Sequence, residues 1–222
     1  METWVNMEKV RKALVVSRYN EDVSKWLLPS YFEDYEIYIY NKGKQDILYH
    51  KQIDNVGRES HTYLYFIINH YSNLPDYTIF LQGDAPDHLL QEEWTNLKTN
   101  TFKLEDYKGM GHHIFEVTGT SIPNHVIQEF PIYRKTPDFL YNHFLKKESN
   151  DIKHIKYSMN AEACFCVSKN NILRHPKEVY INLYNEHYNP IHAKRPGTIV
   201  QYAGTMEYSW HLIFDNIYYK NC

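Results

Sequence analysis

Two carboxylates and an imidazole follow a short apolar segment in the first half of the chain. The apolar run, residues 77–81, reads as a buried strand that ends before Gly83, and Asp84, Asp87 and His88 come directly after it. Open α/β sheets bind their ligands just beyond the carboxyl ends of such strands. Carboxylate oxygens suit Mg²⁺ or Mn²⁺, which complete their shells with substrate phosphates. The segment therefore indicates an enzyme with a phosphate-bearing substrate. The alternative is a solvated turn in which Asp87 caps the next helix.

The elements around this segment alternate between strand and helix patterns. Strands are predicted at residues 13–17, 36–40 and 77–81, and helices through Trp26 and Leu27, over residues 58–74, and through Leu89, Leu90 and Trp94. Lys42 lies in the turn after the second strand and is interpreted as a solvated residue. This alternation is typical of βαβ units and a largely parallel sheet.

The second half has weaker signals. Residues 98–135 lack a regular pattern and are interpreted as a long substrate loop or a disordered stretch. A helix is predicted from Thr136, a strand at residues 163–167, a helix from about Asn170, and a helical tail over residues 206–219. The predicted fold class is α/β: one domain over residues 1–222, with a core at about 13–214 and a mostly parallel central sheet flanked by helices.

Composition narrows the class of protein. The chain has 222 residues, of which 43% are hydrophobic, and a formal net charge of −3. A negative charge gives no support to nucleic-acid binding. No stretch approaches the ~20 apolar residues of a membrane span, and no signal peptide is recognised. Cys164 and Cys166 are expected to be buried thiols on one face of a strand, which favours a cytoplasmic location.

Several motifs in sequence order carry a resemblance to a known family. They are residues 15–22 (VVSRYNED), 40–43 (YNKG), 55–62 (NVGRESHT), 80–88 (FLQGDAPDH), 163–168 (ACFCVS) and 210–214 (WHLIF). Together they resemble the DUF3431 family, a group of largely uncharacterised proteins similar to GT-A glycosyltransferases. The resemblance implies a Rossmann-like GT-A domain that binds a nucleotide sugar, with a UDP-sugar favoured, and uses Mn²⁺ or Mg²⁺.

The resemblance also implies a metal site. Asp84 is the first candidate ligand, Asp87 the second and His211 the third, because GT-A enzymes often supply a late histidine. One departure is that GT-A enzymes commonly carry Asp-x-Asp, whereas Asp84 and Asp87 are separated by two residues. A helix histidine packed beside Trp210 and Phe214 is the alternative for His211.

The donor nucleotide is expected at two loops and at the end of the metal strand. Arg18 is a candidate for phosphate or base and Asp22 for ribose hydroxyls, unless Asp22 only caps a helix. Arg58 and His61 flank the start of the longest helix, where the helix dipole favours an anion, and Glu59 is weighed as an ordinary first-turn acid. The full candidate set for donor binding is Arg18, Tyr19, Asn20, Asp22, Arg58, His61, Gln82 and Gly83.

Two glutamates are candidates for the catalytic base that accepts the proton of the acceptor hydroxyl. Glu162 precedes a strand at the place where inverting GT-A enzymes often carry this acid, although the family pattern favours a small residue there. Glu207 lies one turn before His211 and is the alternative, or else it orients that imidazole.

The expected function is a metal-dependent glycosyltransferase that moves a sugar from a nucleoside-diphosphate sugar to a glycan or protein-linked acceptor. Two other classes stay open. A metal-dependent hydrolase of phosphoesters or nucleotide sugars would use the same side chains to activate water. A non-catalytic nucleotide-sugar-binding module would explain the missing Asp-x-Asp.

Overall fold

The computed structural model describes residues 9–111, 113–118, 156–161, 163–186, 206, 207 and 209–215, with strands 113–118 and 156–161 described by their backbone alone. The helix predicted from Thr136, the candidate base Glu162 and the tail beyond residue 215 lie outside this part of the chain.

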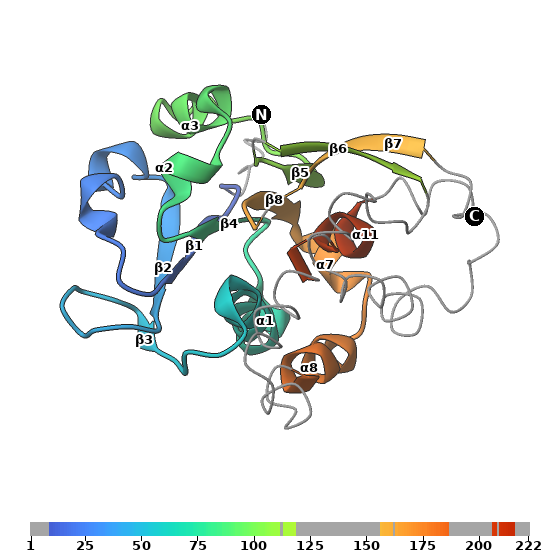
Figure 1. The fold of residues 1–222 in the computed structure, drawn as a ribbon, viewed down its shortest axis with the longest axis horizontal. Coiled ribbons are helices and arrows are strands. Elements are labelled where there is room, and N and C mark those ends of the chain that lie inside the picture. The colour runs from blue at the N-terminus through green and yellow to red at the C-terminus, as the bar shows by residue number, and fades with distance from the viewer. Residues whose placement is uncertain are drawn as a thin grey trace, which may run out of the picture.

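A six-stranded sheet forms the centre of the molecule (Figure 1). Its strands, in spatial order, are β3 (Lys51–Gln52), β2 (Tyr35–Asn41), β1 (Lys12–Arg18), β4 (Tyr77–Gln82), β8 (Phe165–Ser168) and β5 (Tyr107–Gly109). The first four are parallel to one another, whereas β8 is antiparallel to both of its neighbours. The sheet is therefore mixed, and the prediction of a mostly parallel sheet is wrong. A short apolar strand such as β8 has the same hydrophobic pattern in either direction, so its sequence does not predict its orientation in the sheet.

Side chains of successive strand residues enter two hydrophobic layers, as the period of a strand requires. Ala13 and Val15 of β1 belong to the layer under helices α1 (Arg58–His70), α7 (Lys169–Leu173), α8 (Lys177–Glu186) and α11 (Trp210–Phe214). Leu14 and Val16 belong to the opposite layer, which the loop after β1 and helix α3 (Gln91–Lys98) cover. The strands predicted at residues 13–17, 36–40 and 77–81 and the helix from residue 58 are thus confirmed.

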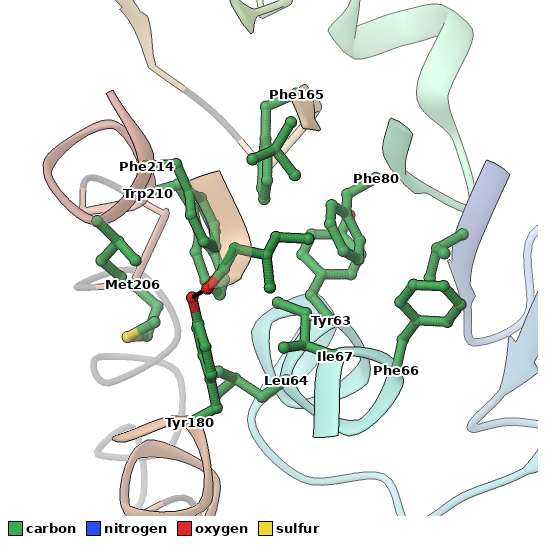
Figure 2. Close-up of a cluster of buried hydrophobic side chains, with 14 of the residues drawn as sticks. Tyr63, Leu64, Phe66, Ile67, Phe80, Phe165, Tyr180, Met206, Trp210 and Phe214 are labelled. Atoms are coloured by element: carbon green, nitrogen blue, oxygen red, sulfur yellow. Dashed lines mark hydrogen bonds between the residues drawn. The ribbon is translucent and has the colours of Figure 1, made fainter. Parts of the chain in front are cut away.

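Aromatic rings dominate the layer under α1 and α11 (Figure 2). Trp210 and Phe214 stack with an interplanar angle of 2°, and Phe165 of β8 packs against both rings. The Tyr180 hydroxyl of α8 donates a hydrogen bond of 2.7 Å to the carbonyl of Ile172. The ring contacts join α11 to the sheet, and the hydrogen bond joins α8 to α7.

Several predicted helices differ from the observed ones. The helix through Trp26 and Leu27 is only a short 3-10 turn, η1 (Val23–Lys25), because Pro29 closes the segment. Asp87 lies inside the four-residue helix α2 (Ala85–His88), so the prediction that it caps the next helix is wrong; Leu90 stands at that position before α3. The region predicted to be irregular contains β5 and β6 (His113–Thr118), the latter paired with β7 (Lys156–Ala161) in a second, two-stranded sheet.

Cys164 and Cys166 are buried in the same hydrophobic layer, as predicted. Among the described residues there is no helix that is long and apolar enough to cross a membrane.

Candidate functional site

The strand order places a topological switch point between β1 and β4. The chain leaves β1 toward β2 on one side and later returns to β4 on the other side. Connections that diverge in this way leave a crevice beyond the carboxyl ends of the two strands, where open α/β sheets bind ligands. Arg18 ends β1 and Gln82 ends β4, so the polar segments predicted to bind ligand start at the same crevice.

A cavity of about 260 Å³ lies in this crevice. Six residues of its lining belong to the candidate set for donor and metal binding, and the others were not in that set. Its lining is Ser17, Arg18, Tyr19, Glu21, Lys42, Asn55, Arg58, Glu59, Gln82, Gly83, Asp84 and His88. Ser17 and Thr62 share a buried hydrogen bond of 2.8 Å between their hydroxyls, which fixes the first turn of α1 against the end of β1.

A larger cavity of about 470 Å³ adjoins the first one. The two share Glu21, Gly83 and Asp84. Aromatic rings of Trp26, Tyr31 and Trp94 line it together with Asp22, Lys25, Pro86, Asp87 and Lys98. The site therefore has two compartments that meet at the segment directly after β4.

Arg18 has a structural role, because its side chain is buried and most of its hydrogen-bond donors are occupied by other residues of the chain. Its side chain is 2% exposed. Nε donates to the Glu21 carbonyl at 2.8 Å, Nη1 donates to Asn41 Oδ1 at 2.7 Å and to the Lys44 carbonyl at 2.9 Å, and Nη2 lies 2.6 Å from Asp46 Oδ1. Most of its donors are thus used to hold the loops after β1 and β2 together.

Lys42 is buried, so its interpretation as a solvated residue is wrong. It is 7% exposed, and Nζ donates to the carbonyls of Val56 and Arg58 and lies 3.4 Å from Nδ1 of His61. Three acceptors match the three donors of an ammonium group. Burial lowers the pKa of Lys42 to about 7, against the opposing charges of Glu59 and Asp54. His61 is fully buried, stacks on Tyr184 and does not line either cavity.

The start of α1 brings a strained backbone and a buried carboxyl to the smaller cavity. Gly57 has φ of 59° and Arg58 has φ of 45°. A left-handed conformation is costly for a residue with a Cβ, and such strain clusters at functional sites. Arg58 keeps its side chain half exposed, whereas Glu59 is 6% exposed. Burial raises the pKa of Glu59, while the positive charges of Arg58 and Lys42 oppose this rise.

Asp84 opens to both cavities. Its side chain is about half exposed at 47%, and Oδ2 lies 3.3 Å from Nε2 of His88. The hydrogen bond with His88 lowers the pKa of the Asp84 carboxyl, and the charge of Arg58 adds to this. Asp87 lines the larger cavity. Within the described ranges there is no group of three or more His, Cys, Asp or Glu side chains arranged to hold a metal ion.

The loop after β1 approaches the two neighbouring turns closely. A Cβ on Gly43 would lie 1.7 Å from the Tyr19 carbonyl oxygen, and a Cβ on Gly83 would lie 2.5 Å from Glu21 Oε2. Tyr19 is half exposed in the smaller cavity, and Asp22 accepts a hydrogen bond of 2.6 Å from Ser24 at the larger one. Asn20 is exposed beside Lys44 and lines neither cavity.

The two C-terminal candidates are not at the cavities. His211 of α11 is 2% exposed, and burial lowers its pKa to about 3. Glu207 precedes α11, and neither residue lines the cavity walls. The structure thus brings Asp84 and Asp87 to the site but places His211 in the core next to Trp210.

The motifs that surround the two cavities match a family model. The match covers residues 14–222, and the model describes a protein of unknown function, DUF3431. The chain belongs to the DUF3431 family. No curated protein and no solved structure matches the chain. The family assignment is thus confirmed, whereas the expected similarity to GT-A glycosyltransferases remains a proposal.

Sequence reasoning missed two buried ionic groups in this DUF3431 protein. Glu59 precedes Tyr63 by four residues and Phe66 by seven, so it continues the buried stripe of α1 by one turn, a signal that was available. The sequence gives no such signal for Lys42, because the carbonyls that it contacts belong to Val56 and Arg58, more than ten residues further along the chain.

Proposed function

We propose that this DUF3431 protein is a metal-dependent glycosyltransferase whose donor, a nucleoside-diphosphate sugar, lies across the crevice between β1 and β4. The observation that carries the proposal is the pair of cavities that meet at Gly83 and Asp84. A nucleotide sugar has two ring-bearing ends joined by an anionic linker, and a two-compartment crevice with a charged junction suits that shape. The proposed fold relation is a GT-A-like domain.

The residues at the junction suit the diphosphate. Arg58 carries a guanidinium on the first turn of a 13-residue helix, where unpaired N–H groups and the helix dipole favour anions. The strained Arg58 backbone fixes the direction in which this side chain leaves the helix. Arg58 thus orients the diphosphate and stabilises its charge as the sugar departs.

Asp84 fits a role as ligand of Mn²⁺ or Mg²⁺. Mg²⁺ is usually bound through one or two carboxylates with the remaining positions taken by substrate phosphates and water. An exposed carboxylate at the junction, with Asp87 nearby on α2, meets this requirement without a third protein ligand. When bound, the cation supplies Lewis-acid stabilisation of the diphosphate. Glu162 stays the predicted base for the acceptor hydroxyl.

Incubation with a panel of UDP- and GDP-sugars in Mn²⁺ tests the proposal. We expect calorimetric binding of at least one nucleotide sugar that depends on the metal, and sugar transfer that depends on an added acceptor. Free sugar released at a rate that no acceptor improves would instead indicate a hydrolase, and binding without turnover a non-catalytic module. Absence of binding for every nucleoside diphosphate would refute the proposal.

A further inference from the structure

Two oxygens at the smaller cavity lack hydrogen-bond partners. Glu59 Oε1 and Gln82 Oε1 are both buried and have no partner among the described residues. The other Glu59 oxygen, Oε2, lies 3.8 Å from Arg58 Nε. Buried polar atoms without partners are uncommon in folded proteins and call for an explanation. Both residues line the cavity, so a ligand that enters it lies beside the two side chains that carry these acceptors.

The charges around Glu59 select the kind of ligand. Two unpartnered acceptors can be satisfied by coordination to a metal cation or by hydrogen bonds from an ammonium group or a hydroxyl. The positive charges of Arg58 and Lys42 already act on the Glu59 carboxylate. A cationic ligand would meet repulsion from both side chains, whereas a hydroxyl brings a donor without a charge. A neutral hydroxyl-bearing group is therefore favoured.

We propose that Glu59 and Gln82 form a hydroxyl-recognition subsite that binds a vicinal diol of a sugar ring. The cavity volume of about 260 Å³ is below the range of ~300–1,000 Å³ typical of sites for whole drug-sized ligands, so it takes one ring and not an entire nucleotide sugar. The inference rests on the proposed function in that the ring belongs to the donor, as its ribose or as its transferred sugar.

Two variants test the subsite. Glu59→Gln removes the charge at constant size, and Gln82→Met removes the amide at similar length. Glu93→Gln is the matched control, because Glu93 is also buried, also has one unpartnered oxygen and lines neither cavity. Affinities for UDP, 2′-deoxy-UDP and UDP-glucose are measured by calorimetry in Mn²⁺. Thermal unfolding of each variant checks the fold.

We expect Glu59→Gln to lose affinity for the hydroxylated ligand by about tenfold or more, the scale expected when a charged acceptor is lost. A wild-type preference for UDP over 2′-deoxy-UDP that disappears in Glu59→Gln places the ribose in the subsite. Equal binding of these two nucleotides, with a selective loss for UDP-glucose, places the transferred sugar there. Gln82→Met should follow the same pattern, and Glu93→Gln should bind as wild type.

Two results would overturn the subsite. One is unchanged affinity of Glu59→Gln for all three ligands. The other is loss of binding of Mn²⁺ alone in Glu59→Gln, which would make Glu59 a metal ligand. If the wild-type protein binds no nucleotide, the proposed function fails, and ribose and glucose at millimolar concentration then decide the subsite by ligand-observed NMR. Glu59-dependent binding of either sugar would uphold it, and its absence would overturn it.

Discussion

Nη1 of Arg18 donates a hydrogen bond of 2.7 Å to Oδ1 of Asn41, which joins the carboxyl ends of β1 and β2. Asn41 is fully buried, and its amide donates in turn to the Lys44 carbonyl and to Gln52 Oε1. Two neighbouring parallel strands therefore end in one polar network. The loops that line the smaller cavity start from this network, so its first role is to shape the site.

Arg18→Ala should destabilise the protein. It removes the Arg18 donors from the Glu21 carbonyl, from Asn41 Oδ1 and from Asp46, which we expect to lower the free energy of unfolding by ~2–4 kcal/mol. Urea denaturation measures this change. A variant that keeps wild-type stability but loses affinity for UDP would show instead that Arg18 contacts the ligand directly.

Asp84→Asn should abolish the Mn²⁺-dependent part of nucleotide-sugar binding while the fold stays intact, because the side chain is half exposed and follows β4. Calorimetry with and without Mn²⁺ measures the loss. Asp34→Asn is the matched control, since Asp34 is also a partly exposed, ion-paired aspartate but lies outside both cavities. Equal metal-dependent binding by the two variants would remove Asp84 from the metal site.

Arg58 offers a test of strain against function. Arg58→Gly should raise the free energy of unfolding by about 1 kcal/mol, because glycine adopts a positive φ without steric cost, and should weaken diphosphate binding. Arg58→Ala keeps the strain and should weaken binding without the gain in stability. Asn100→Gly, at the other described non-glycine residue with positive φ, should leave binding unchanged. Thermal unfolding and calorimetry measure the two effects, and full UDP affinity in Arg58→Ala would contradict the assigned role.

The two close-approach glycines should differ in their tolerance of alanine. In Gly43→Ala the new methyl group meets backbone, the Tyr19 carbonyl, whereas in Gly83→Ala it meets the end of the flexible Glu21 side chain. We expect Gly43→Ala to cost ~2–3 kcal/mol of stability and Gly83→Ala less than ~1 kcal/mol. Similar denaturation midpoints for the two variants would contradict this prediction and show that the loop after β1 can shift to accommodate the methyl group.

Buried His211 predicts a stability loss in mild acid. Burial lowers its pKa from 6.5 in the unfolded chain to about 3 in the folded one. Between these values the unfolded state binds more protons, so the free energy of unfolding falls as pH falls from 6.5 toward 3. The contribution to the slope approaches ~1.4 kcal/mol per pH unit. Denaturation at pH 5, 6 and 7 should give a shallower slope in His211→Gln, and an identical slope would refute the assignment.

The elements that sequence patterns predicted best are those whose apolar residues follow one period. β1, β4 and α1 are found close to their predicted bounds, because burial on one or both faces leaves a clear pattern. β5 was missed because its three residues, Tyr-Lys-Gly, carry no periodic pattern. β6 was missed although Ile114, Phe115 and Val117 favour a strand, because the stretch around it is rich in Gly, Thr and His. The direction of β8 was missed because pairing with β4 and β5 is a long-range property.

The sequence predicted those site residues whose position is fixed by the end of a strand. Asp84 and Gly83 follow β4, and the switch point brings them to Tyr19 and Arg58. The sequence did not predict which of these polar side chains have a structural role and which face the cavity. Arg18 and Lys42 have the residue type of anion-binding groups, but the carbonyls that occupy them come from loops distant in sequence. Which donors remain open to a ligand depends on tertiary packing alone.

The aromatic layer shown in Figure 2 can be completed only late in translation. Trp210 and Phe214 are fully buried, and both pack against Phe165, yet they belong to the last described helix. A nascent chain emerges from its N-terminus, so β1, β2, α1 and β4 leave the ribosome long before the rings that cover them. Until residue 214 emerges, one face of the sheet lacks part of its cover. Chains stalled at residue 205 should therefore bind hydrophobic dyes and chaperones, whereas release of the full chain should end that binding.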